Sequence, residues 1–146
     1  MTTPERPALL GRTVGIDEYG QLDTFPADPD LTLVELGGDE LTAMCPGVAG
    51  LQPDFYRWSV RYRPNQRCLE SKSLKLYLLT FRDVAVFAEH LCARIARDLA
   101  AVLDTEVTVR LTQQRRGGIE TTAEATGCPP PGPAVTTGTR ALEPGR

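Results

Sequence analysis

The chain has 146 residues, of which 41% are hydrophobic and 24% charged, and this size suits one globular domain with a modest core. Its formal net charge of -3 gives no electrostatic reason to expect a nucleic acid as partner, whereas a free base or nucleotide remains compatible. No apolar run approaches the roughly 20 residues of a membrane helix, and the first residues form no signal-like apolar core, so we expect a cytoplasmic protein.

Both ends of the chain are rich in turn-forming residues. Residues 1–30 carry many Pro, Asp and Gly, which predicts an irregular N-terminal arm. Residues 127–146 contain a run of prolines and almost no large apolar side chains, so burial cannot offset the entropy of ordering them. We therefore predict a disordered tail, with the folded domain over residues 31–126.

The folded part begins with two expected strands. The first covers residues 31–36. In the second, residues 55–63, apolar and polar side chains alternate cleanly, as in a half-buried strand.

Two helices are expected next. Ser71 or Ser73 can cap a short helix, although the same residues also fit a strand, and we favour the helix. Asp83 is expected to cap a longer helix, because apolar residues recur at helical spacing over residues 87–102.

Two further strands complete the pattern. Residues 107–112 alternate again, and the glycines at 117 and 118 predict a turn into a last strand over 119–125. The order is strand, strand, helix, helix, strand, strand.

The four cysteines lack the paired spacing of metal ligands, and the chain has one histidine. We expect reduced thiols and no metal site. Cys128 lies in the predicted tail and is not expected to be catalytic. The other three are Cys45, Cys68 and Cys92.

Three blocks of the sequence resemble one enzyme family. The first is the run Leu69-Glu70-Ser71-Lys72-Ser73-Leu74-Lys75-Leu76-Tyr77, the second is Cys45-Pro46 followed by Gln52-Pro53-Asp54, and the third is Arg116-Gly117-Gly118-Ile119. Together they resemble the NADPH-dependent 7-cyano-7-deazaguanine reductases, the nitrile reductases of queuosine synthesis. The resemblance covers residues 31–125.

The resemblance implies a fold and an assembly. The family has the tunnelling fold, an α+β fold of order ββααββ, in which a four-stranded antiparallel sheet carries two helices on one face. Such sheets join edge to edge into a barrel, which removes their exposed edges. A chain of this length is similar to the single-domain members, which implies a decamer of two pentamers.

The resemblance also implies the chemistry. Cys45 would attack the nitrile carbon to form a thioimide, Asp54 would be the general acid/base, and NADPH would supply the hydrides. Without the family, Cys45 reads as a small buried residue and Asp54 as a turn residue. The spacer from residue 47 to 51 is two residues longer than in the family.

The remaining site residues follow from the same resemblance. Glu89 would bind the guanine-like edge of the base, because a carboxylate accepts two N–H donors there. The family's histidine position is Ala88, and His90, about 200° further around a helix, is kept as a weaker candidate for proton transfer. The other substrate candidates are Leu69, Glu70 and Ser71, and the cofactor candidates are Lys72, Ser73, Lys75, Arg115, Arg116, Gly117 and Gly118.

Three alternatives stay open. One is an amidinotransferase of the archaeosine type, which adds ammonia to the same nitrile. Another is a reductase of a specialised 7-deazapurine pathway. The third is a binding protein for deazapurines or pterins that has lost catalysis.

Overall fold

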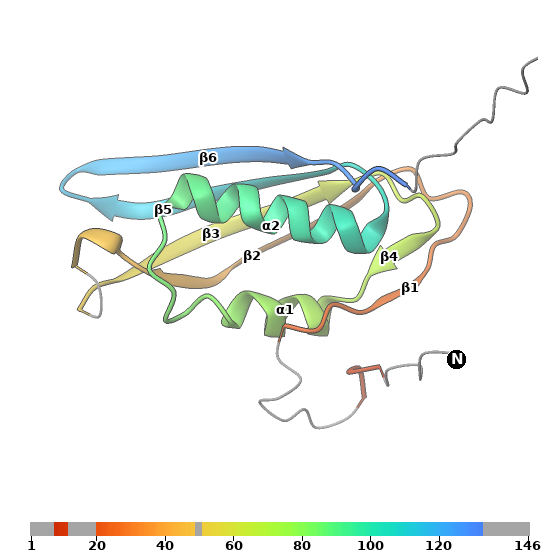
Figure 1. Ribbon diagram of the computed structural model, residues 1–146, viewed down its shortest axis with the longest axis horizontal. Coiled ribbons are helices and arrows are strands. Elements are labelled where there is room, and N and C mark those ends of the chain that lie inside the picture. Colours follow the sequence, from red (N-terminus) through yellow and green to blue (C-terminus); the bar gives the residue numbers. More distant parts are fainter. Residues whose placement is uncertain (1–7, 12–19, 49–50, 133–146) are drawn as a thin grey trace, which may run out of the picture.

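The structure is a computed structural model that describes residues 8–11, 20–48 and 51–132. Its main sheet is antiparallel, with strand order β2-β3-β5-β6, and consists of β2 (Val34–Met44), β3 (Pro53–Tyr62), β5 (Val107–Arg116) and β6 (Ile119–Gly127). The helices are α1 (Ser71–Leu79) and α2 (Ala88–Leu103). The expected α+β order ββααββ is confirmed for this sheet (Figure 1).

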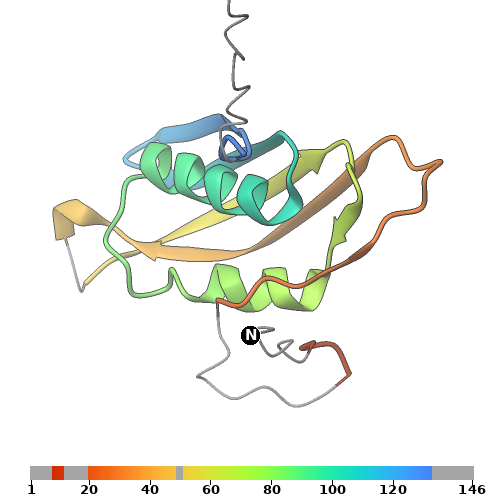
Figure 2. The same ribbon diagram turned by 45° about the vertical axis from the view of Figure 1, so that its right-hand side comes forward.

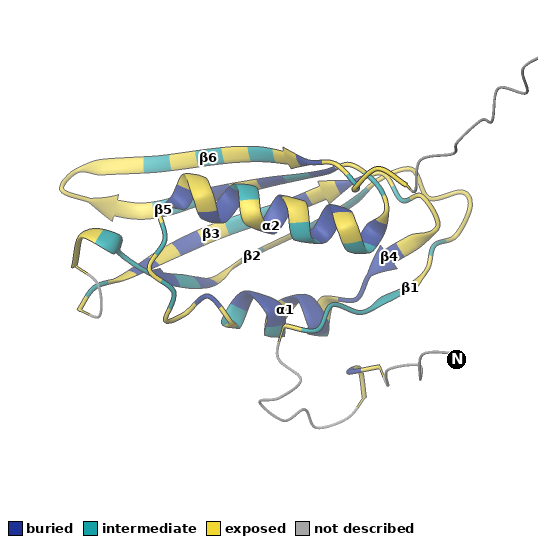
Figure 3. Ribbon diagram, in the orientation of Figure 1, coloured by how far each residue is buried: buried dark blue, intermediate teal, exposed yellow. Residues whose placement is uncertain are grey.

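Both helices cover one face of the sheet. The helix α2 lies across β5 and β6, and α1 lies beside β2 (Figure 2). Figure 3 shows that the buried residues line the layer between sheet and helices. The core joins alternate residues of β3 and β5 to one face of α2, and its fully buried members include Tyr56, Val60, Val109, Leu111, Leu91, Ile95 and Leu99.

One glycine sets how closely α2 approaches the sheet. A Cβ atom at Gly127, the last residue of β6, would lie 2.2 Å from the Ala96 carbonyl oxygen of α2. Only glycine therefore allows the end of β6 to pass this helix.

The start of α1 differs from the expectation. Its N-cap is Glu70, whose carboxylate accepts hydrogen bonds from the backbone N–H groups of Lys72 and Ser73 at 2.7 and 2.8 Å. Ser71 and Ser73 are therefore not the cap. Ser73 lies inside, where its hydroxyl donates to the Glu70 carbonyl oxygen and accepts from the Asp23 N–H.

The start of α2 also differs. The helix begins at Ala88 with Phe87 at its N-cap position, so Asp83 does not cap it. The cause is a bridge to the end of β2, in which the Met44 N–H donates to the Val84 carbonyl and the Val86 N–H donates to the Met44 carbonyl. This pairing holds the segment before Ala88 extended.

The predicted arm contains a strand. β1 (Thr24–Pro26) pairs with β4 (Arg67–Leu69), and neither strand was predicted from the sequence. Leu9 is fully buried, and its N–H donates to the Asp23 carboxylate. Residues 128–132 form neither helix nor strand, and most of the predicted tail, from 133 onward, lies outside the described residues.

The sheet is open at both edges in the single chain. β2 and β6 each pair with one neighbour only, so no closed barrel exists within the subunit. In the described ranges no helix has the length and apolarity needed to span a membrane.

A hydrogen bond joins the two helices. The Tyr77 hydroxyl of α1 donates to the Asp98 carboxylate of α2 at 2.6 Å. Burial and the Asp98 charge raise the pKa of Tyr77, so the hydroxyl remains protonated and remains a donor.

The substitution Tyr77→Phe should lower the free energy of unfolding by about 1.5–3 kcal/mol, because it removes a hydrogen bond to a charged group and leaves Asp98 without this donor. Urea unfolding measures the change. An unfolding midpoint equal to that of the wild type would show that the bond contributes nothing.

Candidate active site

Cys45 sits directly after β2 in a compact turn. Its N–H donates to the Gln52 carbonyl at 3.0 Å, and its own carbonyl accepts from the Val48 N–H, which closes the 3₁₀ helix Pro46–Val48. The chain then enters β3 with Ala43 opposite Asp54. The strands on both sides of the longer spacer are paired, and Cys45 and Asp54 lie at the same end of the β2–β3 pair.

Asp54 is a buried acid, with 3% of its surface exposed. Its Oδ1 atom has no hydrogen-bond partner, and Arg116 Nε lies 3.8 Å from it, which is an ion-pair distance. The Arg116 guanidinium also donates to the Pro53 carbonyl. The hairpin between β5 and β6 thus reaches the candidate acid/base.

The first turn of α2 lies at the same end of the β2–β3 pair as Cys45 and Asp54. Because the segment before α2 bridges to Met44, the helix starts beside the Cys45 turn. Ala88 is buried and Glu89 is exposed. His90 is exposed and its ring lies edge-on to Phe87, with ring centroids 6.4 Å apart.

Tyr56 is a residue of this end that the sequence analysis did not single out. Burial, and then the negative charges of Asp54 and Glu89, raise the pKa of Tyr56. The alternation of β3 could have identified it, since residues 54 and 56 share a face. We call Cys45, Asp54, Tyr56, Glu89 and Arg116 the Cys45 group.

The glycines of the β5–β6 turn have positive φ, 56° at Gly117 and 79° at Gly118, which explains a glycine pair there. Arg115 is exposed, and its Nε lies 3.7 Å from the Glu120 carboxylate. These residues accompany Arg116 at the Cys45 end of the sheet.

The lysine-bearing segment has its own set of contacts. The Leu69 N–H donates to the Tyr62 hydroxyl at 2.8 Å, and Lys72 Nζ donates to the Leu9 carbonyl at 3.1 Å. Ser71 and Lys75 are exposed, one helical turn apart. We call Glu70, Ser71, Lys72 and Lys75 the α1 group.

A cavity of about 350 Å³ separates α1 from β2. Ser71 and Lys75 line it together with Trp58, whose indole Nε1 is buried without a partner. Gly38 makes room for this ring, because a Cβ there would lie 2.8 Å from it. An apolar wall, an unpaired donor and a lysine fit a ring-bearing anionic ligand such as a nicotinamide nucleotide.

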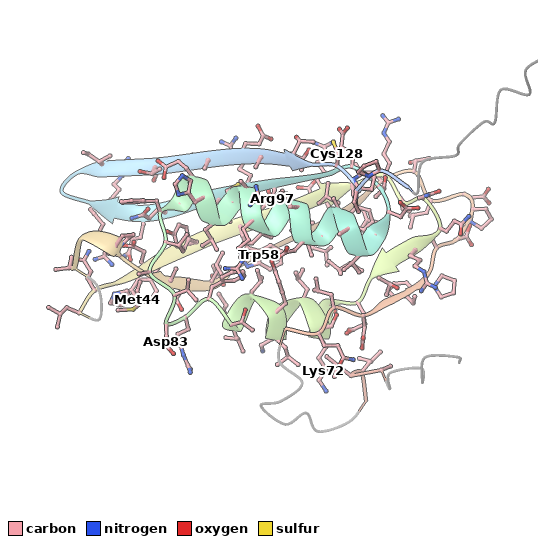
Figure 4. The ribbon with its side chains drawn as sticks, in the orientation of Figure 1. Met44, Trp58, Lys72, Asp83, Arg97 and Cys128 are labelled. Carbon is pink, nitrogen blue, oxygen red and sulfur yellow. The ribbon has the colours of Figure 1, made fainter. Side chains whose placement is uncertain are left out.

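The two groups lie on different elements. Figure 4 shows Met44, next to Cys45, on the left of the view and Lys72, at the start of α1, just right of the middle. Among the described residues, no three His, Cys, Asp or Glu side chains gather as a metal site would require.

Comparison with known proteins identifies the family. The family model described as "QueF-like protein" matches residues 53–131. An NADPH-dependent 7-cyano-7-deazaguanine reductase of Frankia casuarinae is 43% identical over 106 residues, covering 72% of this chain and 83% of that protein. A protein of the same name from Syntrophus aciditrophicus is 39% identical over 130 residues, covering 85% and 90%.

A solved structure shares the fold. The apo form of an archaeosine synthase described as QueF-Like superposes with a TM-score of 0.60 at 22% identity, covering 68% of this chain and 97% of the other. Its identity is too low to carry more than the fold. With the family model and the curated relatives, the conclusion is that this chain belongs to the QueF-like family.

Proposed function

We propose that this protein is an NADPH-dependent nitrile oxidoreductase that reduces 7-cyano-7-deazaguanine to 7-aminomethyl-7-deazaguanine. The curated relatives that carry this activity in their names support the substrate and the cofactor. The observation that carries the proposal is the placement of a half-exposed thiol, Cys45, at the same strand ends as the buried carboxyl group of Asp54.

The first step is the addition of Cys45 to the nitrile. The sulfur attacks the nitrile carbon, a C–S bond forms, and one π bond of the nitrile opens so that its electron pair moves to nitrogen. Asp54 takes the thiol proton and delivers it to that nitrogen, which gives a neutral thioimide with no net gain or loss of protons. Burial of Asp54 keeps water from competing for the proton.

Bound NADPH supplies hydride, and reduction of a nitrile to an amine takes four electrons, hence two successive hydrides. Lys72 and Lys75 are the candidates for the cofactor's phosphates, because both lie in the first turns of α1 and Lys75 lines the cavity beside Trp58. Ser73 contributes indirectly, since its buried hydroxyl holds the helix start. Arg115, Arg116 and the turn Gly117-Gly118 are the second candidate anion site.

For the substrate, the exposed carboxylate of Glu89 suits the amino-pyrimidinone edge of the base. The other substrate candidates, Leu69, Glu70 and Ser71, lie at the start of α1. The carboxylate of Glu70 already caps this helix. His90 stays a weak candidate for proton transfer, because its exposed ring lies against Phe87.

We also propose that subunits join through β2 and β6, forming the decamer of two pentamers that the family resemblance implies. Two observations support this association. Both edges of the sheet are unpaired, and the Cys45 and α1 groups lie apart in one subunit. A neighbouring subunit could bring an α1 group to a Cys45 group.

The same cysteine chemistry would serve an amidinotransferase that adds ammonia to the nitrile. The fold of the archaeosine synthase fits this reaction as well as reduction. Lys75, which lines the α1 cavity, favours a nucleotide cofactor, and therefore the reductase, in either the queuosine pathway or a specialised one. A pure binding protein would not need Cys45 and Asp54 together.

With 7-cyano-7-deazaguanine, the wild-type chain should oxidise two equivalents of NADPH per aminomethyl product, followed by absorbance and mass spectrometry. Cys45→Ala should abolish both the oxidation and the protein adduct, and Asp54→Asn should slow the reaction about 100- to 10,000-fold. An adduct without oxidation of NADPH would favour the amidinotransferase, and neither signal would favour binding alone.

Trp58 is the single tryptophan, so its fluorescence reports on the α1 cavity. NADPH should quench it, and Lys75→Gln should weaken the quenching affinity about three- to tenfold through loss of a charge-assisted contact. Arg82→Gln, which removes an exposed cation outside the cavity, is the matched control and should leave the affinity unchanged. Equal affinities in both variants would remove Lys75 from the cofactor site.

If the site is shared between subunits, two inactive variants should complement each other. Cys45→Ala and Lys75→Glu, mixed, unfolded together and refolded, should regain part of the wild-type activity, whereas each variant refolded alone should not. Light scattering should give a mass well above the 15.9 kDa of one chain. A monomeric, fully active protein would contradict the shared site.

A further inference from the structure

Three buried polar atoms on one face of β3 have no hydrogen-bond partner in the chain. They are Asp54 Oδ1, Tyr56 Oη and Trp58 Nε1, and among the described residues they are the only buried side-chain nitrogen or oxygen atoms without a hydrogen bond, although Asp54 Oδ1 lies at ion-pair distance from Arg116. Residues two apart in a strand point to one face, about 7 Å from each other. The three side chains therefore form a line from the Cys45 group to the α1 cavity.

Buried polar atoms in folded proteins are nearly always paired, so an unpaired one requires a reason. A line of three along one strand is not explained by a local packing fault. Two of the three residues already have a proposed role. Asp54 is the acid/base at the strand end next to Cys45, and Trp58 lines the α1 cavity. The middle member, Tyr56, has no role so far.

The surroundings of Tyr56 are acidic. Its side chain is 2% exposed, and burial together with the charges of Asp54 and Glu89 raises its pKa. The hydroxyl therefore keeps its proton at neutral pH, so it can act as a hydrogen-bond donor and not as a base.

The other buried tyrosines differ from Tyr56 in one respect. The Tyr62 hydroxyl accepts from the Leu69 N–H, and the Tyr77 hydroxyl donates to the Asp98 carboxylate. Both hydroxyls are used by the fold. Tyr56 has the same burial without such a bond, which indicates a partner that arrives with the substrate.

We propose that the Tyr56 hydroxyl donates a hydrogen bond to the nitrile nitrogen of the substrate and stabilises the negative charge that develops there as Cys45 attacks. This role rests on the proposed reductase function and adds a residue to its site. Asp54 transfers the proton, and Tyr56 keeps its own.

The chemistry of the nitrile nitrogen fits two protein groups. Before attack the nitrogen has one lone pair, which can accept from Tyr56. As the C–S bond forms, a second electron pair reaches the nitrogen and takes the proton delivered by Asp54, while the first pair stays on Tyr56. The Tyr56 hydrogen bond strengthens as charge grows, so it lowers the barrier more than it strengthens substrate binding.

The test compares Tyr56→Phe with Tyr77→Phe in the full chain, because both changes remove one buried hydroxyl. The readouts are the rate of thioimide formation from 7-cyano-7-deazaguanine without NADPH, followed by absorbance and by adduct mass, and the thermal unfolding midpoint. Tyr56→Phe should slow thioimide formation about ten- to hundredfold and leave the midpoint unchanged or raised, since it removes an unpaired buried group. Tyr77→Phe should lower the midpoint and leave the rate unchanged where the variant is folded.

Two results would overturn the role of Tyr56. One is thioimide formation at the wild-type rate in Tyr56→Phe. The other is a midpoint lowered as in Tyr77→Phe, because the hydroxyl would then have a partner in the fold. If the wild-type chain forms no thioimide and oxidises no NADPH, the proposed function itself is refuted. This outcome is distinct from the two results above, because it is seen in the wild type and not in the variant.

Discussion

The pairing of the end of β2 with the start of β3 is the constraint on which the candidate site depends. This pairing places Ala43 opposite Asp54, and the Cys45 N–H bond to Gln52 closes the turn between the strands. Met44, the last residue of β2, also bridges to the segment before α2. One strand terminus thereby locates a thiol, a carboxyl group and the first turn of a helix.

Much of the fold was predictable because its elements have clear periods. The alternation in β3 and β5 and the apolar stripe of α2 each reflect burial on one face, and the structure confirms them. The pair β1–β4 was not predictable, since strands of three residues are too short to show a period. The helix starts differ from the prediction for other reasons: Glu70 caps α1 in place of a serine through local bonds to Lys72 and Ser73, and the residues after Asp83 pair with Met44, a tertiary contact that no local pattern encodes.

The site was predictable where it coincides with a family signature, and otherwise was not. Tyr56 looked like an ordinary core residue of an alternating strand, and only the absence of a partner for its hydroxyl separates it from Tyr62. Ser73 shows the opposite case. It stands inside the signature, yet its hydroxyl ties α1 to Asp23 and Glu70, so a signature residue can serve the fold that presents the site.

The turn after Cys45 bears on how such a site can vary. Between Cys45 and Asp54 the chain has eight residues where the family pattern has six, and closing the longer loop costs only about 0.3 kcal/mol more in chain entropy. The strands beneath it keep their register, with Met44 still opposite Pro53. The length of the loop between Cys45 and Asp54 therefore has little effect on stability. Insertions can change this loop while the thiol and the carboxyl group stay at their strand ends.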